Sequence, residues 1–224
     1  MTAAKDLADK MHRTFFRTLS LLSSRGQGAL LRRYFDWWHR RPDPWNMGTD
    51  AYEQAKYAAT LAQVSAGPYR RILEMGCSEG VFTQRLVRAH PDAHVTAVDI
   101  SERALRRAAE RVAEAADRTL LVAADLLTFT AEHRYDLVFC SETLYYVGRG
   151  DRLRQASAQL IGLLAPGGVL VLVHPWPEAR RLHRFVDASG AVSRVSEFVE
   201  TAAHRPFAVS VYRAPGRTAA SATG

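Results

Sequence analysis

Cysteine is scarce in this sequence, and it has no long apolar run and no cluster of side chains with metal-ligand spacing. Only Cys77 and Cys140 are present, and two thiols do not make a disulfide framework, so we expect a reducing, cytoplasmic location. No apolar run approaches the roughly 18 residues that a membrane span needs, so we expect no stable membrane association. The lack of clustered histidine, cysteine and carboxylate residues predicts that no metal is bound.

Lysine is also rare, which bears on the basic net charge. The formal net charge is +7 and the isoelectric point is near 9.8, values that by themselves would suggest a nucleic-acid partner. Lysine occurs only at Lys5, Lys10 and Lys56, so arginine supplies most of the positive charge, and alanine is abundant as well. This bias is typical of a GC-rich coding background rather than of a phosphate-binding surface. We therefore expect no nucleic-acid partner.

Strands and helices alternate from about residue 70 onward. The expected strands cover residues 71–75, 94–98, 119–123, 136–140 and 169–173, and the expected helices cover 82–89, 102–115 and 152–164. Such alternation predicts an α/β fold with a parallel sheet and right-handed crossovers. Residues 165–168 are expected to form the turn between the last of these helices and its strand. Residues 194–201 and 207–213 predict an antiparallel pair of strands, because only a short turn joins them.

The first sixty residues are expected to form helices outside this sheet. Residues 1–41 indicate two amphipathic helices and residues 52–64 a third, separated by a break at Pro42 and Pro44. We expect residues 1–60 to form a lid over the carboxyl edge of the sheet, residues 70–213 the core and residues 215–224 a disordered tail, all in one domain of residues 1–224. The helices could instead form a dimer contact or lie on a membrane surface, and both a monomer and a homodimer remain open.

The most informative segment is Ile72–Gly80, where a strand turns into a helix. Gly76 and Gly80 allow a backbone to approach a nucleotide cofactor closely. The G-x-G-x-x-G pattern of dinucleotide binding is absent, since Glu74 replaces its first glycine and Glu79 lies in the turn. Two carboxylates would repel a pyrophosphate. They suit the cationic sulfonium and ammonium groups of S-adenosylmethionine (SAM), which we therefore expect as the cofactor.

Acidic residues follow the next two strands at the spacing that such a cofactor needs. Asp99 ends the second strand and can accept hydrogen bonds from both ribose hydroxyls, with Ile100 beside it. Asp125 ends the third strand and could accept from the adenine amino group, while Leu126 packs on the ring. An acidic residue after a strand can also be a simple helix cap or turn residue, and it is the spacing from the glycine turn that favours the cofactor site.

These segments resemble the motifs of class I SAM-dependent methyltransferases, and more narrowly those of the nodulation-type N-methyltransferase family, which methylates an amine on a chitooligosaccharide. The resemblance runs from about residue 43 to 213 and rests on residues 43–45, 73–77, 80–83, 123–125, 142–146 and 164–168. It implies a Rossmann-like, seven-stranded, mostly parallel sheet with an antiparallel last strand and helices on both faces. It also implies a SAM pocket formed by Trp45, Glu74, Gly76, Cys77, Gly80, Asp99, Ile100, Asp125, Leu126 and Ser141.

The chain departs from that family in two places that would border the acceptor. Residues 174–177 read His-Pro-Trp-Pro where an Arg-Asp pair is expected, and the first forty residues differ as well. The acceptor is therefore expected to be a small molecule, an amino sugar or another natural product. An amine acceptor is the leading interpretation and a hydroxyl acceptor the first alternative; an RNA substrate or a non-catalytic SAM-binding protein rank below these.

Four residues near the expected pocket mouth are candidates for the chemistry. A methyl acceptor must be aligned and, if it is an amine, neutral, so a carboxylate or imidazole nearby is useful. Glu142 is the best candidate for holding or deprotonating an amine, and Tyr145 and Tyr146 follow within one turn. His174 is a candidate base or a structural histidine. Trp45, Tyr52 and Trp176 could wall the acceptor or pack on the cofactor.

Overall fold

The computed structural model describes residues 14–216. The first 13 residues of the expected lid, and the part of the expected tail from residue 217, lie outside the described residues.

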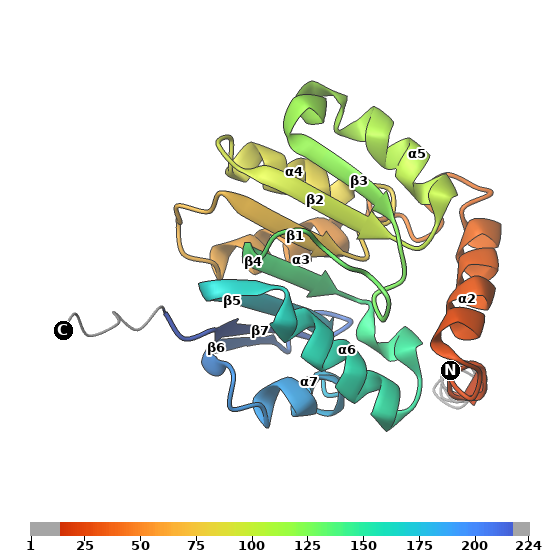
Figure 1. Ribbon diagram of the computed structural model, residues 1–224. Helices are drawn as coiled ribbons and strands as arrows, with labels where there is room; N and C mark the ends of the chain where they lie inside the picture. Colours follow the sequence, from red (N-terminus) through yellow and green to blue (C-terminus); the bar gives the residue numbers. More distant parts are fainter. Residues whose placement is uncertain (1–13, 217–224) are drawn as a thin grey trace.

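The fold centres on a seven-stranded sheet with the order β3-β2-β1-β4-β5-β7-β6 (Figure 1). Neighbours among β1 to β5 are parallel, and β7 is antiparallel to both β5 and β6. This topology confirms the predicted parallel sheet and antiparallel last strand. The strands are β1 Arg71–Met75, β2 His94–Asp99, β3 Thr119–Ala123, β4 Tyr135–Ser141, β5 Leu164–Pro175, β6 Ser193–Glu200 and β7 Phe207–Arg213.

The strand order reverses direction between β1 and β4, and this reversal positions the site. From β1 the chain builds outward through β2 and β3, then returns to place β4 on the other side of β1. Loops that leave the carboxyl ends of β1 and β4 therefore diverge, and the crevice between them is where open α/β sheets bind ligands.

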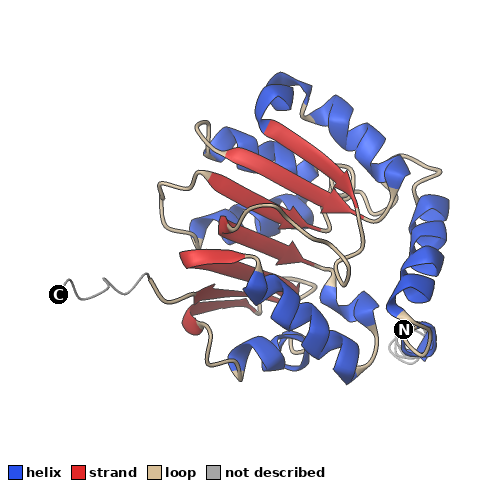
Figure 2. Cartoon of the chain, in the orientation of Figure 1, coloured by secondary structure: helices blue, strands red, loops and turns tan. Residues whose placement is uncertain are grey.

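Helices cover both faces of the sheet, as predicted (Figure 2). Side chains of α3 and α4 pack with Ile72, Leu137 and Val171 on one face, whereas α6 and α7 pack with Val138 and Leu170 on the other. The alternation of these strand residues follows from the period of two along a strand. The helices are α2 Ser24–Trp38, α3 Ala51–Ala62, α4 Val81–Ala89, α5 Glu102–Arg111, α6 Gly150–Gly162 and α7 Ala179–Asp187, with short 3-10 turns η1 Ala113–Arg118 and η2 Leu144–Val147.

Three features of the secondary structure differ from the sequence-based expectations. The helix expected over 102–115 ends at Arg111, because Ala115 leaves the helical region (φ −130°) and η1 follows. Residues 165–168 lie inside β5 at an irregularity of its pairing with β4, with Gly167 at φ 74°, and do not form a separate turn. Helix α7 was not predicted, although Leu182 and Val186 are spaced four apart and both are buried.

Helix α2 stands at the carboxyl edge of the sheet (Figure 1). Residues 14–19 are helical as well, so the described part of the N-terminal segment confirms two helices, and Ser23 caps α2 by accepting from the Gly26 amide. Near the C-terminal end of α2, Asp36 accepts hydrogen bonds from the Ser101 hydroxyl at 2.7 Å and the Arg103 amide at 3.3 Å. A carboxylate is favourable at that position, which is the N-terminus of α5.

A buried hydrogen-bonded chain joins β5, α7 and β7. The Leu144 amide donates to His174 Nε2 at 3.2 Å, which makes His174 Nδ1 the donor to His183 Nε2 at 2.9 Å. His183 Nδ1 in turn lies 3.0 Å from the Ser210 hydroxyl, which donates to Glu197 at 3.2 Å. Burial lowers the pKa of His174 well below its ordinary value and that of His183 to about 3. Both imidazoles are therefore neutral in the folded protein at neutral pH.

The two neutral, buried histidines of this hydrogen-bonded chain predict that the folded protein loses stability in acid. Below about pH 6.5 the unfolded protein binds protons at both histidines and the folded protein does not, so stability is complete above pH 6.5 and falls by about 1.4 kcal/mol per pH unit for each histidine as the pH drops toward 4.5. In His183→Gln the side-chain amide can keep both hydrogen bonds but does not titrate. We therefore expect the decrease in stability per pH unit to be smaller by about 1.4 kcal/mol, the contribution of one histidine. Denaturant unfolding at several pH values measures it. Exposed His94, changed to Gln, is the control; equal slopes for His183→Gln and the parent would contradict the prediction.

Candidate active site

A cavity of about 1180 Å³ opens at the carboxyl edge of the sheet. Its walls are the loops that follow β1, β2, β3 and β4 on one side, and α2 and α3 on the other. Its volume exceeds the roughly 300–1,000 Å³ of a pocket for a single drug-sized ligand. Every residue predicted for the site lines this cavity except Gly80 and His174.

The turn after β1 is held against the end of β2. The amides of Gly76 and Cys77 both donate to the Val98 carbonyl, at 2.8 and 3.0 Å. Gly76 has φ 85°, and a Cβ there would lie 2.2 Å from the Thr143 hydroxyl oxygen, so only glycine fits. Glycine is required at this position by the backbone conformation and by the contact with Thr143.

Glu74 is a buried carboxyl group on the cavity wall. It is 5% exposed and accepts a hydrogen bond from the Thr83 hydroxyl at 2.6 Å. Burial raises its pKa to about 8. A cation in the cavity would favour the ionised form of this group, because it would supply the opposite charge that the pocket otherwise lacks at that point.

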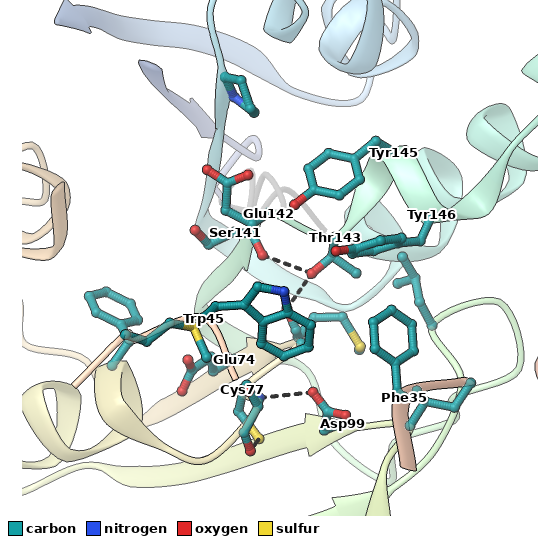
Figure 3. A pocket seen from close by; sticks show the side chains of 18 of the residues that line it. Phe35, Trp45, Glu74, Cys77, Asp99, Ser141, Glu142, Thr143, Tyr145 and Tyr146 are labelled. Atoms are coloured by element: carbon teal, nitrogen blue, oxygen red, sulfur yellow. Dashed lines mark hydrogen bonds between the residues drawn. The ribbon is translucent and has the colours of Figure 1, made fainter. Parts of the chain in front are cut away.

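Asp99 is held rigidly at the end of β2. Its two carboxylate oxygens accept from the amides of Ser78 and Ser101, each at 2.8 Å (Figure 3). Each oxygen retains a lone pair, and the neighbouring residue Ile100 also lines the cavity. This orientation suits a ligand that offers two hydroxyl groups. At the end of β3, Asp125 accepts from the Leu127 amide at 2.7 Å, and the side chain of Leu126 is buried in the cavity wall.

The prediction that Glu79, in the turn after β1, would face a cationic cofactor is wrong. Glu79 does not face the cavity: it is 2% exposed and accepts from His39 Nδ1 at 2.9 Å, the Asp43 amide at 3.0 Å and Arg107 at 2.8 Å. Burial raises the pKa of Glu79, but these hydrogen bonds outweigh it and the net pKa is lowered. Its charge is thus already balanced, and of the two glutamates of this segment only Glu74 lines the cavity.

Gly80 has a packing role. It begins α4 at φ 75°, and a Cβ there would lie 3.0 Å from the Cβ of Ala108 on α5. Gly80 therefore permits close contact between two helices and does not line the cavity. The sequence pattern places a glycine at this turn but does not say which neighbour requires it.

Of the two roles that the sequence left open for His174, a base or a structural histidine, the geometry supports the structural one. It is fully buried, both ring nitrogens are engaged with Leu144 and His183, and it does not line the cavity. Alternation along β5 places it on the face covered by α7. Its lowered pKa results from burial first and from its neighbour His183 second.

The loop after β4 brings Ser141, Glu142, Tyr145 and Tyr146 to the cavity, as predicted (Figure 3). Glu142 has φ 52°, in the left-handed region, and its amide donates to the Val173 carbonyl at 2.9 Å. This conformation costs a non-glycine residue about 1–3 kcal/mol and is common at functional sites. Burial raises the pKa values of both tyrosines, so their phenols stay protonated.

Lys56 on α3 is a site residue that sequence analysis missed. It is 3% exposed, and its ammonium lies 2.9 Å from carboxylate oxygens of both Glu53 and Glu142. Burial lowers its pKa, but the two carboxylates outweigh burial and the net pKa is raised. Lys56 is thus charged and fixes the Glu142 carboxylate. A signal existed: Lys56 is one of only three lysines in an arginine-rich chain.

Aromatic rings from the N-terminal segment close the cavity. Phe35 of α2 packs against Tyr146 with ring centroids 4.9 Å apart, and Trp45 lies 6.1 Å from Trp38 and 6.4 Å from Phe35. In Figure 3 the Trp45 indole lies between Asp99 on one side and Glu142 with Tyr145 on the other. Trp45 therefore lines the cavity together with residues from the ends of β2 and β4.

The opposite end of the cavity lies beside the turn between β6 and β7. Tyr52 and Trp176, considered from the sequence as acceptor walls, both line the cavity. Arg205 from the turn stacks over the Tyr52 ring at 4.4 Å and lies 3.2 Å from Glu53. Sequence analysis assigned no role to this turn, because its contact with α3 spans 152 residues.

Two further features concern the described residues 14–216. None of their helices is long and apolar enough to cross a membrane. Within the same residues, no group of three or more histidine, cysteine or carboxylate side chains could hold a metal ion. Cys77 and Cys140 are both buried and free.

The fold is similar to those of solved methyltransferases. The structure of the N-methyltransferase NodS from Bradyrhizobium japonicum, in complex with S-adenosyl-L-homocysteine (SAH), has a TM-score of 0.73 and 24% identity, covering 82% of this chain and 98% of that one. A Burkholderia thailandensis 1,6-didemethyltoxoflavin N1-methyltransferase has a TM-score of 0.68 and 20% identity, with coverage of 87% and 91%. At these identities the likeness establishes the fold.

Sequence relatives establish the family. Nodulation protein S of Sinorhizobium fredii is 34% identical over 130 residues, 58% of this chain and 59% of that protein. Nodulation protein S of Bradyrhizobium diazoefficiens is 30% identical over 160 residues, with coverage of 71% and 74%. The chain thus spans about three fifths of the length of the first of these relatives. Residues 23–202 match the family model of nodulation protein S (NodS), and the chain belongs to this family.

Proposed function

We propose that this protein transfers a methyl group from SAM to an amine of a small molecule. The observation that carries the proposal is the single cavity that presents Glu74 and Asp99 at the ends of β1 and β2, and Glu142 at the end of β4. We call the part of the cavity with Glu74 and Asp99 the cofactor half and the part with Glu142 the acceptor half. Methyl transfer requires that two molecules bind side by side in one cavity, and these two halves could hold them. Membership of the NodS family supports this assignment.

The cofactor half fits SAM residue by residue. Glu74 would bind the ammonium group, Asp99 the two ribose hydroxyls and Asp125 the adenine amino group, with Ile100 and Leu126 on the faces of the ring. Gly76 lines the cavity between these residues. A relative of the same family has been solved with SAH. When bound, SAM supplies an electrophilic methyl group on a sulfonium.

The acceptor half aligns a nucleophile rather than activating it by strong base catalysis. Lys56 donates to Glu142 Oε1 at 2.9 Å and so fixes the position of the carboxylate. An ionised carboxylate can accept a hydrogen bond from an incoming amine and point the nitrogen lone pair into the cavity. Glu142 can also receive the amine proton, directly or through water. Alignment and exclusion of water are the main contributions that an enzyme makes to such a displacement.

An amino sugar or another natural product is the acceptor that we propose, and the N-terminal helices serve as its lid. The support is membership of a family whose solved relative is named an N-methyltransferase, together with the position of α2 and Trp45 over the cavity. A hydroxyl or carboxylate acceptor is the alternative: a trans-aconitate 2-methyltransferase of Delftia acidovorans is 28% identical over 157 residues. Mass spectrometry of products from a panel of amine, hydroxyl and carboxylate acceptors distinguishes these classes.

Asp99→Ala should weaken SAH binding by about 10-fold to 150-fold, because charge-assisted hydrogen bonds to hydroxyls contribute about 1.5–3 kcal/mol. Calorimetric titration with SAH measures the affinity, and thermal unfolding shows whether loss of the Ser78 and Ser101 contacts has unfolded the variant. Exposed Asp117, changed to Ala, is the control. Unchanged affinity in a folded Asp99→Ala protein would remove Asp99 from the cofactor site.

SAH affinity should increase with pH between 6 and 8. Glu74 has a pKa of about 8 in the free protein, and binding an ammonium group requires its ionised form, so binding releases a proton. Affinity should therefore fall by up to about tenfold for each pH unit below 8. In Glu74→Gln the affinity should be low and nearly independent of pH. The same pH dependence in both proteins would show that another group titrates.

Glu142→Gln should reduce the single-turnover rate by roughly 100-fold, because the shape is kept and the charge is lost. SAH affinity should hold within about threefold, since Glu142 belongs to the acceptor half. The Glu142 carboxylate bonds Lys56, and no side chain caps η2. Surface Glu132→Gln is the control. A full rate in the Glu142 variant would refute its role in alignment.

A further inference from the structure

Helix α2 presents one polar side chain to the cofactor cavity, that of Gln27. Gln27 is fully buried and lines the cavity together with Leu31 and Phe35 of the same helix. Its Nε2 donates to the Val147 carbonyl at 3.1 Å. Its carbonyl oxygen Oε1 is buried and has no hydrogen-bond partner among the described residues. A buried acceptor without a partner is unfavourable and rare in folded proteins, so it calls for an explanation.

The orientation of the Gln27 amide is fixed by its neighbour. Exchanging Nε2 and Oε1 would set a carbonyl oxygen against the Val147 carbonyl and lose the hydrogen bond. Oε1 therefore stays the free atom and can only accept. Any group that satisfies it must bring an N–H or O–H donor into the cavity.

The position of Gln27 identifies which part of a ligand it would meet. A Cβ on the next residue, Gly28, would lie 3.0 Å from Asp125 Oδ2, so this turn of α2 lies directly against the carboxylate at the end of β3. Asp125, Leu126 and Leu127 line the same part of the cavity. Two acceptors on different elements, Asp125 on the sheet side and Gln27 on the helix side, thus flank the end where the proposed function places the adenine ring.

We propose that Gln27 Oε1 accepts a hydrogen bond from the exocyclic amino group of the cofactor's adenine. That amino group carries two N–H donors, so one can go to Asp125 and the other to Gln27. This inference rests on the proposed function, because it assumes a SAM-type cofactor in the cavity. It makes Gln27 a specificity-determining residue: a base with a carbonyl oxygen at this position would face two acceptors and no donor.

The ligand pair that tests the proposal is SAH and S-inosyl-L-homocysteine, which differ in the amino group. The ratio of their dissociation constants is the readout, since disturbing α2 without a base contact weakens both ligands alike. We expect the parent protein to prefer SAH, and Gln27→Met to lower that preference by about 3-fold to 10-fold, the range for one neutral hydrogen bond. Gln84→Met is a matched control, because Gln84 also donates to a helix carbonyl, that of Arg111, but lies outside the cavity.

The outcomes separate the two levels of the proposal. If the parent binds neither ligand, the cofactor assignment itself fails. If the parent prefers SAH and Gln27→Met keeps the same ratio, the role of Gln27 is refuted and the proposed function stands. If Gln27→Met does not fold, NMR of the parent with SAH labelled with ¹⁵N at the amino group decides: two distinct amino proton resonances support two acceptors, and a single averaged resonance overturns the proposal.

Discussion

The Glu79 carboxylate ties the N-terminal segment to the sheet, and the cavity depends on that attachment. It accepts from His39 just after α2, from the Asp43 amide in the proline-rich break and from Arg107 on α5. Arg107 also donates to the His39 carbonyl, and Arg111 to the Glu79 carbonyl. Breaking one partner of such a buried, charged network leaves an uncompensated group and costs far more than a surface ion pair. The positions of α2 and Trp45 over the carboxyl edge follow from this network.

A second charged network, centred on the buried Lys56, forms the wall of the proposed acceptor half. Lys56 lies between Glu53 and Glu142, and Arg205 reaches Glu53 from the turn between β6 and β7. Three elements distant in sequence are thereby coupled at one wall of the cavity. Because the buried Lys56 has two carboxylate partners, it avoids the large penalty of an isolated buried ion. Glu142 is then held in its strained backbone conformation by both its amide and its side chain.

The two halves of the cavity that the proposed function distinguishes are built from different kinds of groups. The cofactor half relies on backbone groups at strand ends, such as the amides that orient Asp99. The acceptor half relies on long side chains from α3 and the β6–β7 turn. Backbone geometry at the ends of parallel strands is set by the fold itself, whereas side chains on helices and turns can vary while the fold is kept. Differences in acceptor among related proteins are therefore expected at residues such as Lys56 and Arg205.

The sequence by itself determined the sheet and the strand-end positions of the cofactor site. Alternation of strands and helices, the glycine at position 76 and the acidic residues 99 and 125 are local patterns, and local patterns fix which residues end each strand. Only the tertiary structure decided where longer side chains point. Glu79 turned toward His39 and Arg107, and His174 turned into the core rather than the cavity. Lys56 met Glu142 across 86 residues, and Gln27 met Val147 across 120. Such contacts depend on how whole elements pack, and no spacing along the chain encodes them.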